Sequence, residues 1–201
     1  MTSETTSETT SNDPLRRFAE LFARAEKAIP KDPNAMLLAT TDAQGRPSSR
    51  VVLLKDFDAR GFAFYTNFNS RKGQELLARR WAALCFYWPP LDVQVRVEGA
   101  VETIAPEEAD AYFASRPRGS QVGAWASQQS APLASRAALE TSAEEVEKRF
   151  EGKAVPRPPH WGGFRLVPSR IEFWHGRPDR LHERVLFTRE GEHWRSALLN
   201  P

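Results

Sequence analysis

The chain has 201 residues, 28 of them basic and 26 acidic, which gives a formal net charge of +2 and a hydrophobic content of 40%. These values are normal for a globular protein with a buried core, and the near balance of charge does not require nucleic acid or an anionic membrane as partner. Cys85, the one cysteine, excludes an intrachain disulfide and a cysteine-based zinc site, and we expect it to be a buried structural thiol. No apolar run approaches the roughly 18 residues of a membrane span and the N-terminus has no signal segment, so we expect a cytoplasmic protein.

Residues 1–12 are rich in Ser, Thr and Glu, and we expect them to form a disordered tail ahead of a single domain at residues 13–201. Asp13 followed by Pro14 is typical of a helix N-cap and first turn. Apolar residues at helical spacing after Pro14 predict a helix that ends before Pro30.

Short apolar runs separated by turn residues predict a series of strands after this helix. We interpret the first three as a β-meander, formed by residues 36–41, 48–57 and 62–67. Later strands are predicted at residues 81–88, 93–104, 163–167, 170–175, 184–188 and 194–199. Further helices are predicted at residues 71–80, 106–115, near Ala124, and at 134–150. Many short strands with few helices favour a small antiparallel barrel with helices attached, a mainly β or α+β fold.

The strand segment Arg50 to Lys55 has a basic residue at each end of a run of Val and Leu. Because alternate residues of a strand share a face, Arg50 and Lys55 are expected on opposite faces. The two charges are then either two solvated strand ends or two separate anion contacts, one on each face.

Ser70, Arg71 and Lys72 begin the predicted helix at residues 71–80, directly after a strand that ends in Tyr65, Thr66 and two asparagines. The free N–H groups of a helix N-terminus attract anions, and basic residues in the first turn oppose the helix dipole unless an anion compensates them. This segment therefore indicates a phosphate site as readily as a solvated surface.

A second basic segment lies between residues 112 and 121. Tyr112 and Arg116 are four residues apart, a spacing that would place them side by side on one helix face. Together with Ser120 they would form a second phosphate-binding cradle, and the alternative is a basic surface loop.

Residues 174–184 combine an indole, two histidines and three arginines near the end of a strand. Arg180, His182 and Arg184 are expected to share one strand face. Histidine titrates near neutral pH and can orient or exchange a proton with a substrate hydroxyl. A metal site is not expected, because no carboxylate or cysteine stands at ligand spacing, and His160 and His193 are interpreted as incidental.

The sequence contains no GxxxxGK[ST] loop, no strand-linked GxGxxG, no GxSxG and no HExxH motif. Gly162 and Gly163 are interpreted as a tight backbone turn. We therefore expect a phosphate to be held by side chains and one helix end, without a dedicated nucleotide-binding fold.

Taken together, these segments resemble the pyridoxine/pyridoxamine 5'-phosphate oxidase family of FMN enzymes. The resemblance runs from about Asp13 to the C-terminus. It is carried by RVVLLK (50–55), FYTN (64–67), SRKG (70–73), QVRVEG (94–99), YFASRPRGSQ (112–121), GAWAS (123–127), VPRPPHWGGFRL (155–166), IEFW (171–174) and GRPDRLHER (176–184).

The resemblance implies a six-stranded antiparallel split β-barrel with surrounding helices, assembled as a homodimer with FMN in each intersubunit cleft. The family's FMN contacts fall on Arg50, Val51, Val52, Leu53, Leu54, Lys55, Tyr65, Thr66, Arg71, Lys72, Gln94, Gln129, Ser130, Trp174 and Arg184. Its substrate-phosphate contacts fall on Lys55, Tyr112, Arg116 and Ser120. Arg180 and His182 match the catalytic pair that covers the substrate ring opposite the flavin. Arg50 would then serve the FMN phosphate and Lys55 the substrate phosphate.

The implied activity is that of a pyridoxal 5'-phosphate synthase in vitamin B6 biosynthesis and salvage. Pyridoxamine 5'-phosphate or pyridoxine 5'-phosphate would be oxidised to pyridoxal 5'-phosphate, with O2 as acceptor and H2O2 as product, and the amine would also release NH3. The protein's part would be alignment and charge stabilisation, because the flavin carries the oxidation chemistry.

Two alternatives remain open at this level: a related split-barrel flavin enzyme with another substrate, such as a phenazine-pathway oxidase, and a non-catalytic binder of pyridoxal phosphate. The sequence also departs from the family pattern at both ends. Residues 1–12 contain neither the Arg nor the Tyr of the family's N-terminal lid segment, and Leu198 stands where the family usually has Arg.

Overall fold

The computed structural model describes residues 13–201, so the tail predicted at residues 1–12 lies outside the described residues. Its helices are α1 (Pro14–Ala28), α2 (Arg71–Arg79), α3 (Pro106–Ser115), α4 (Arg118–Ala126) and α5 (Arg136–Arg149). Its strands are β1 (Ala35–Thr41), β2 (Pro47–Leu53), β3 (Asp56–Asp58), β4 (Gly61–Asn67), β5 (Trp81–Trp88), β6 (Val93–Thr103), β7 (Trp161–His175), β8 (Glu183–Glu190) and β9 (His193–Leu199). Within the described part, no helix is both long and apolar enough to cross a membrane.

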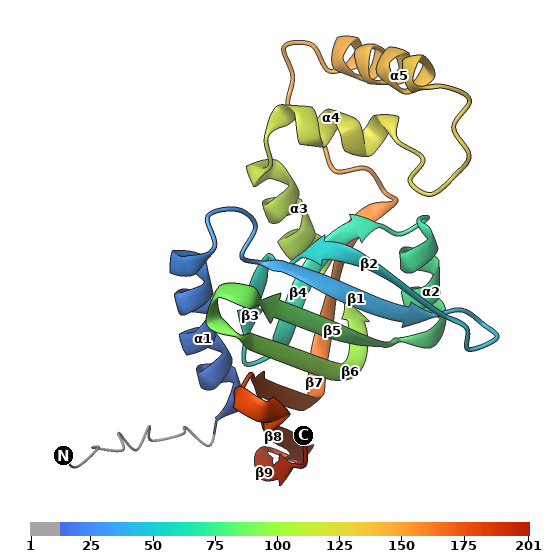
Figure 1. Ribbon diagram of the computed structural model, residues 1–201. Helices are drawn as coiled ribbons and strands as arrows, with labels where there is room; N and C mark the ends of the chain where they lie inside the picture. Colours follow the sequence, from blue (N-terminus) through green and yellow to red (C-terminus); the bar gives the residue numbers. More distant parts are fainter. Residues whose placement is uncertain (1–12) are drawn as a thin grey trace.

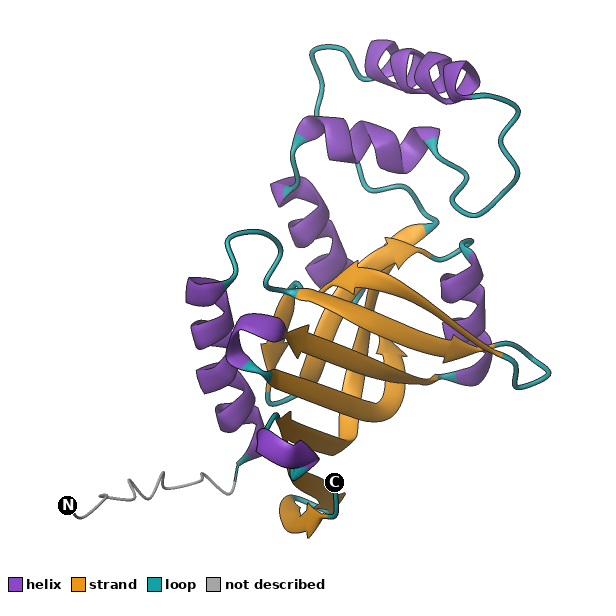
Figure 2. Cartoon of the chain, viewed as in Figure 1, coloured by secondary structure: helices purple, strands orange, loops and turns teal. Residues whose placement is uncertain are grey.

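The strands form one antiparallel sheet in the order β2-β1-β5-β6-β7-β4-β3, and β8 and β9 extend it from β7. This sheet curls into an open barrel, with α1 along one side, α2 at the end of the β1–β2 hairpin, and α3 to α5 projecting from one end (Figures 1 and 2). The predicted α+β split barrel is confirmed. The strand count differs, because β3, β8 and β9 are present in addition to six barrel strands.

The predicted β-meander is wrong, because the strand expected at residues 48–57 breaks at Leu54. Leu54 is buried, and its N–H donates to the carbonyl of Asn34 at 2.9 Å. The next N–H, of Lys55, donates to the carbonyl of Ala63 at 2.9 Å. The chain thus leaves β2 at one edge of the sheet and enters β3 at the other, and β4 pairs with β3 and β7 instead of β2.

The two strands predicted at residues 163–167 and 170–175 form one continuous strand, β7. Pro168 has no N–H to donate, and it lies opposite Gly99 where the pairing of β6 with β7 shifts register. A Cβ at Gly99 would fall 2.0 Å from the carbonyl oxygen of Val167, so only glycine fits there. The irregularity absorbs the proline without ending the strand.

Helix α1 forms where the cap signal placed it: the Asp13 side chain accepts a hydrogen bond from the Leu15 N–H at 2.9 Å. The helix buries one face against the barrel, and Phe18 at its centre is fully buried. The ring of Phe18 meets Phe57, Phe62 and Phe86 edge-on, at 4.9, 4.9 and 5.0 Å between centroids. Such edge-to-face contacts add to the burial energy and fix the helix on the sheet.

A second, smaller core lies between β7 and the helices α3 to α5. It is formed by Phe113, Val122, Phe150, Val155 and Trp161. These residues join the helical part to the start of β7, and the space between this part and the barrel is the location of the candidate site.

We predict that Phe18→Ala lowers the free energy of unfolding by about 3–5 kcal/mol, because it removes a large buried ring and leaves a cavity between α1 and the sheet. Urea unfolding of the full chain measures this loss. Arg16→Ala, on the exposed face of the same helix, is the control and should change stability by less than about 1 kcal/mol. Equal losses in the two variants would contradict the central role of Phe18.

Candidate functional site

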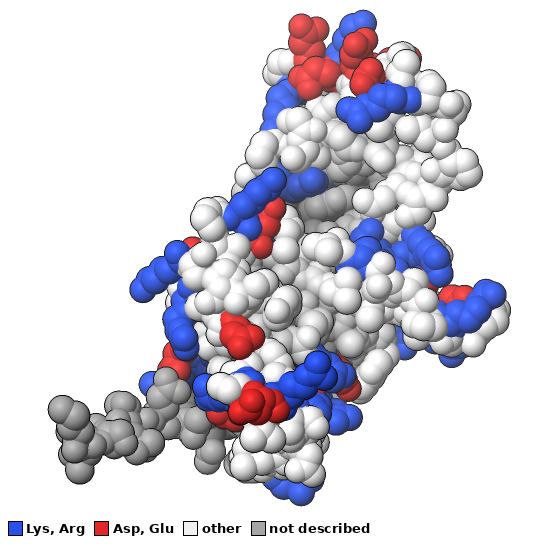
Figure 3. Space-filling model, in the orientation of Figure 1, with Lys and Arg blue, Asp and Glu red and all other residues white. Residues whose placement is uncertain are grey.

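A cavity of about 630 Å³ lies between the barrel and the helices α3 and α4. Figure 3 shows a hollow in this region with basic side chains around it. Eight of the predicted cofactor residues line the cavity: Val51, Val52, Leu53, Lys55, Tyr65, Thr66, Lys72 and Gln129. The four predicted substrate-phosphate residues also line it: Lys55, Tyr112, Arg116 and Ser120. Segments from β2 to α4 are therefore brought to one place by the fold.

Arg116 is the residue of this cavity whose chemistry most clearly requires an anion. Its Nη1 atom is buried and has no hydrogen-bond partner within residues 13–201. Its guanidinium lies over the ring of Trp161, 4.7 Å from the centroid, and burial lowers its pKa. A buried cationic donor without an acceptor is costly, and a bound anion would satisfy it.

The predicted helical pairing of Tyr112 with Arg116 is wrong in its geometry. Helix α3 ends at Ser115, and Arg116 follows it with extended backbone angles (φ −73°, ψ 149°). The two residues still line the same cavity, because Arg116 turns back over Trp161.

Three aromatic rings form one wall of the cavity. Tyr65 stacks on Tyr112 at 4.0 Å between centroids and on Trp161 at 5.4 Å. Burial, followed by the charge of Glu108, raises the pKa of Tyr65 to about 12, so its phenol is neutral at physiological pH. This aromatic lining with two phenol hydroxyls suits a heteroaromatic ligand.

Sequence reasoning missed Trp161 and misread the two glycines beside it. Gly162 and Gly163 lie inside β7 and do not form a turn. A Cβ at Gly163 would fall 2.8 Å from the ring of Tyr65, so glycine allows the ring to lie against the strand. An aromatic residue followed by two glycines was the available signal for this close approach.

The N-terminus of α2 contributes the polar end of the site. The Ser70 hydroxyl caps the helix by accepting from the Gly73 N–H at 3.2 Å. Lys72 Nζ donates to Gln129 Oε1 at 2.9 Å, and the Thr66 hydroxyl donates to the same oxygen at 3.1 Å. Burial and the nearby charge of Arg50 lower the pKa of Lys72. Basic side chains thus crowd around a helix N-terminus, an arrangement that favours an anion.

Arg50 and Arg71 lie beside this helix end but do not line the first cavity. Both bind the buried carboxylate of Glu75, a residue that sequence reasoning did not select. Burial would raise the pKa of Glu75, but hydrogen bonds from Thr40, Ser48 and Arg71 outweigh it and lower the pKa to about 2. The carboxylate is therefore charged at physiological pH.

A second cavity of about 630 Å³ adjoins the first and shares Asn67, Ser127 and Gln129 with it. Arg71 and Ser130, two predicted cofactor residues, line this second cavity. Ser130 has a positive φ of 72°, a backbone state that is uncommon outside glycine and concentrates at functional sites.

His160 and His193, both interpreted as incidental, lie in different surroundings. His160 lines the second cavity, and its Nε2 lies 3.1 Å from the carbonyl oxygen of Ala124. His193 is exposed at the start of β9.

Leu54, another predicted cofactor residue, is buried in the barrel core and lines neither cavity. The other predicted residues form a separate group at the β6–β7–β8 end of the sheet. Gln94 pairs in register with Trp174, which pairs with Arg184. The His182 ring lies 4.6 Å from the Trp174 ring, and Arg184 binds Glu172 at 2.8 Å. The lining of the two cavities described above includes none of these residues.

The expected strand face of Arg180, His182 and Arg184 is wrong, because β8 begins only at Glu183. Arg180 belongs to a 3₁₀ turn and has a positive φ of 61°. Asp179, beside it, has a φ of 56°, so two consecutive residues adopt left-handed backbone angles at this turn.

The outer face of the sheet connects these two groups. Val51 pairs with Leu37, which pairs with Cys85, and Tyr87 on the same face pairs with Gln94. Exposed fractions of 65% for Val51, 42% for Leu37 and 57% for Tyr87 leave an apolar strip open. Cys85 is half-buried on this strip rather than fully buried, and burial raises its pKa.

The comparisons with known proteins agree along the whole described chain. Residues 22–150 match the family described as pyridoxamine 5'-phosphate oxidase, and residues 161–201 match the pyridoxine 5'-phosphate oxidase C-terminal dimerisation region. The chain is 64% identical over 189 residues to a pyridoxine/pyridoxamine 5'-phosphate oxidase of Myxococcus xanthus, covering 94% of this chain and 92% of the relative. It is 55% identical over 204 residues to the Brucella canis enzyme of the same name, with full coverage of both chains.

Two solved structures share the fold. PhzG from Burkholderia lata, solved with tetrahydrophenazine-1-carboxylic acid, has a TM-score of 0.90 and 35% identity, covering 96% of this chain and 95% of that one. An FMN-binding protein of Nostoc punctiforme related to pyridoxamine 5'-phosphate oxidase has a TM-score of 0.76 at 19% identity, covering 94% and 98%. The chain belongs to the pyridoxine/pyridoxamine 5'-phosphate oxidase family.

Proposed function

We propose that this protein oxidises pyridoxamine 5'-phosphate and pyridoxine 5'-phosphate to pyridoxal 5'-phosphate as an FMN-dependent homodimer. The observation that carries the proposal is the buried, unpaired Nη1 of Arg116 in a cavity that also presents Lys55, Tyr112 and Ser120. Two cationic and two hydroxyl side chains at one end of an aromatic-walled cavity are the donors that a phosphorylated heteroaromatic ring requires.

The residues present also fit FMN. Arg50, Arg71 and Lys72 surround the N-terminus of α2 and provide a cationic end for its phosphate, while Thr66 and Gln129 offer polar atoms along the cavity wall. When bound, FMN would supply the oxidation chemistry, a two-electron transfer from the substrate to O2 that gives H2O2.

The homodimer accounts for the separation of the predicted site into two groups. Gln94, Trp174, Arg180, His182 and Arg184 lie away from the cavity of their own chain but follow the apolar strip that contains Leu37, Val51 and Tyr87. A second copy packed on this strip would bring its own group to the cavity. The match of residues 161–201 to a dimerisation region supports this arrangement.

The chain's own residues would act by alignment and charge. Lys55, Arg116 and Ser120 hold the substrate phosphate, which fixes the distance of the ring from the flavin. Arg184 and Gln94 of the second copy place donors around the flavin ring, where negative charge develops on reduction. Arg180 and His182 close the other face of the substrate ring and exclude water from it.

The two substrates differ in the group on C4', which is a hydroxyl in one and an amine in the other. The alcohol loses two hydrogens to O2 and gives the aldehyde and H2O2 directly. The amine likewise loses two hydrogens to O2, which gives an imine and H2O2, and one water then converts the imine to the aldehyde and NH3.

A phenazine-type oxidation is the second candidate, because PhzG shares the fold at a TM-score of 0.90. The identity of 35% to PhzG, against 64% to the Myxococcus xanthus enzyme, favours the phosphorylated substrate.

We predict that the natively purified protein is yellow and that its flavin absorbance bleaches when pyridoxamine 5'-phosphate is added without oxygen. Readmission of air should restore the bands and release H2O2 in equal amount to the pyridoxal 5'-phosphate formed. Binding of the substrate without bleaching would indicate a non-catalytic binder. A preparation without flavin that cannot be loaded with FMN would contradict the proposal.

We predict that Arg116→Ala raises KM for pyridoxamine 5'-phosphate by about 10- to 100-fold, because a charge-assisted hydrogen bond to phosphate is lost. The FMN content should be unchanged. Steady-state kinetics on the phosphorylated substrate measure the effect, and Arg136→Ala, an exposed arginine on α5, is the control. An undiminished kcat/KM in Arg116→Ala would show that the cradle is assigned incorrectly.

We predict that Tyr87→Asp converts the dimer to monomers and removes bound FMN, because a charge is placed in the apolar strip and each site loses the residues that the second copy contributes. Light scattering gives the mass, and absorbance gives the flavin content. Leu133→Asp, at a residue 55% exposed in the loop before α5, is the matched control and should remain dimeric and yellow. A monomer with full flavin content would refute the shared site.

A further inference from the structure

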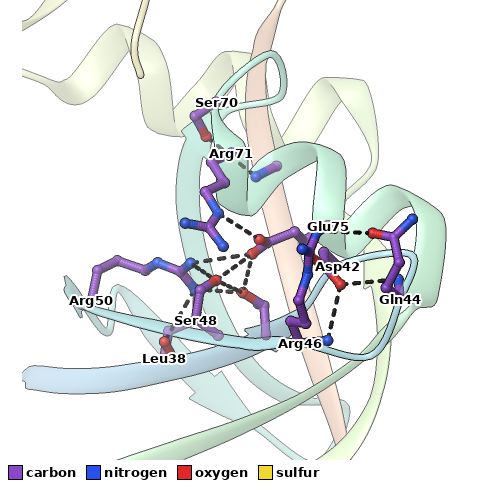
Figure 4. Close-up of polar contacts among 11 residues, drawn as sticks. Leu38, Asp42, Gln44, Arg46, Ser48, Arg50, Ser70, Arg71 and Glu75 are labelled. Carbon is purple, nitrogen blue, oxygen red and sulfur yellow. Dashed lines mark hydrogen bonds and ion pairs between the residues drawn. The ribbon is translucent and has the colours of Figure 1, made fainter. Parts of the chain in front are cut away.

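Glu75 is a buried acidic residue in a region that otherwise gathers positive charge. It lies on α2, one turn after Arg71, and faces the β1–β2 hairpin (Figure 4). Only 6% of the residue is exposed. A carboxylate removed from water in this way is costly unless it is paired and hydrogen-bonded.

Both carboxylate oxygens of Glu75 accept hydrogen bonds. Oε2 accepts hydrogen bonds from the hydroxyls of Thr40 at 2.5 Å and Ser48 at 2.7 Å, and from Arg50 Nη2 at 3.2 Å. Oε1 accepts from Arg71 Nε at 2.8 Å. One carboxylate therefore connects an arginine of β2 with an arginine of α2.

Besides its ion pair with Glu75, Arg50 donates hydrogen bonds to three further groups. Its Nη1 donates to the Thr40 hydroxyl at 2.6 Å and to the Leu38 carbonyl at 3.2 Å, and its Nη2 donates to the Ser48 hydroxyl at 2.6 Å. Thr40 and Ser48 thus accept from Arg50 while they donate to Glu75. This closed network fixes the guanidinium in one orientation.

Arg71 is fixed differently. Its Nε is used by Glu75, while its side chain is 63% exposed and lines the second cavity. Only Nε of Arg71 bonds to Glu75, so its terminal nitrogens are not used by this carboxylate.

We propose that Glu75 is a positioning residue, whose buried carboxylate holds Arg50 and Arg71 at a fixed separation, so that Arg71 presents its terminal nitrogens and Arg50 its remaining Nε–H to the phosphate of FMN. The proposal rests on the proposed function, because it assigns FMN to this site. Glu75 does not touch the cofactor in this proposal and acts only through the two arginines.

The physical reason is preorganisation. A free arginine loses about 2 kcal/mol of rotamer entropy when it is fixed, and a site that has already fixed two of them binds an anion without that cost. The negative charge of Glu75 opposes a phosphate by Coulomb repulsion, so the carboxylate favours FMN only if its effect on geometry outweighs its charge.

These two effects have opposite signs, and Glu75→Gln separates them. The substitution keeps the size of the side chain and removes its charge. Charge alone predicts tighter binding of FMN by the variant, whereas positioning predicts weaker binding.

The experiment is a fluorescence titration of the full chain, stripped of flavin, with FMN and in parallel with riboflavin, which lacks the phosphate. We expect Glu75→Gln to raise Kd for FMN by about ten-fold (about 1.4 kcal/mol) and to leave Kd for riboflavin within about two-fold of the wild type. Glu140→Gln is the matched control, because Arg136 and Glu140 form the same i, i+4 pair at 2.9 Å on the exposed surface of α5.

Equal or tighter FMN binding by Glu75→Gln would overturn the proposal, and so would an equal loss for FMN and riboflavin. If Glu75→Gln does not fold, as judged by circular dichroism, Ser48→Ala is measured instead. It removes one hydrogen bond to each of Glu75 and Arg50, and the same FMN-specific loss is expected. A wild-type chain that binds neither flavin would refute the proposed function instead, so the two failures are distinguishable.

Discussion

Compensation of buried charge is the constraint on which the arrangement of this site depends. Glu75 is paired with Arg50 and Arg71, and on the other side of the sheet Glu172 is paired with Arg96 and Arg184. In both places one buried carboxylate satisfies two arginines from different elements, and so fixes their separation. Arg116 is an exception, since its buried Nη1 has no hydrogen-bond partner within residues 13–201. A charge left uncompensated in the folded chain marks the place where a ligand supplies the missing acceptor.

The break in the strand at Leu54 places Lys55 in the cavity. Simple strand alternation would have placed Arg50 and Lys55 on opposite faces of one strand. Because β2 ends at Leu53, Lys55 lies beyond the strand and lines the cavity with Val51 and Leu53, while Arg50 remains in the Glu75 network. The separation of the two charges begins with the pleat, which turns Arg50 and Val51 to opposite faces of β2, and it is kept because the chain leaves the strand after Leu53 and carries Lys55 to the cavity.

Local signals predicted the elements well, and tertiary contacts explain the errors. The caps at Asp13 and Ser70 fix their helices through neighbours in sequence, so both helices begin where expected. The break at Leu54 depends on the distant carbonyl of Asn34, which no local pattern indicates. Local pattern left the phosphate cradle of Tyr112, Arg116 and Ser120 as one of two interpretations, and the resemblance to a family favoured it. Glu75 was missed because a glutamate four residues after an arginine usually marks an exposed helix pair.

The apolar strip on the sheet explains why the two groups of site residues need each other. Leu37 and Tyr87 leave apolar surface open that a stable monomer would bury, and Gln94 lies directly beside Tyr87 across the strand pair. Under the proposed dimer, burial of this strip and completion of the flavin site are one event. By linkage, a cofactor that contacts both chains then stabilises their association by the same free energy by which association strengthens its binding. In that dimer, the apolar strip and the two groups of site residues at its ends form one binding site.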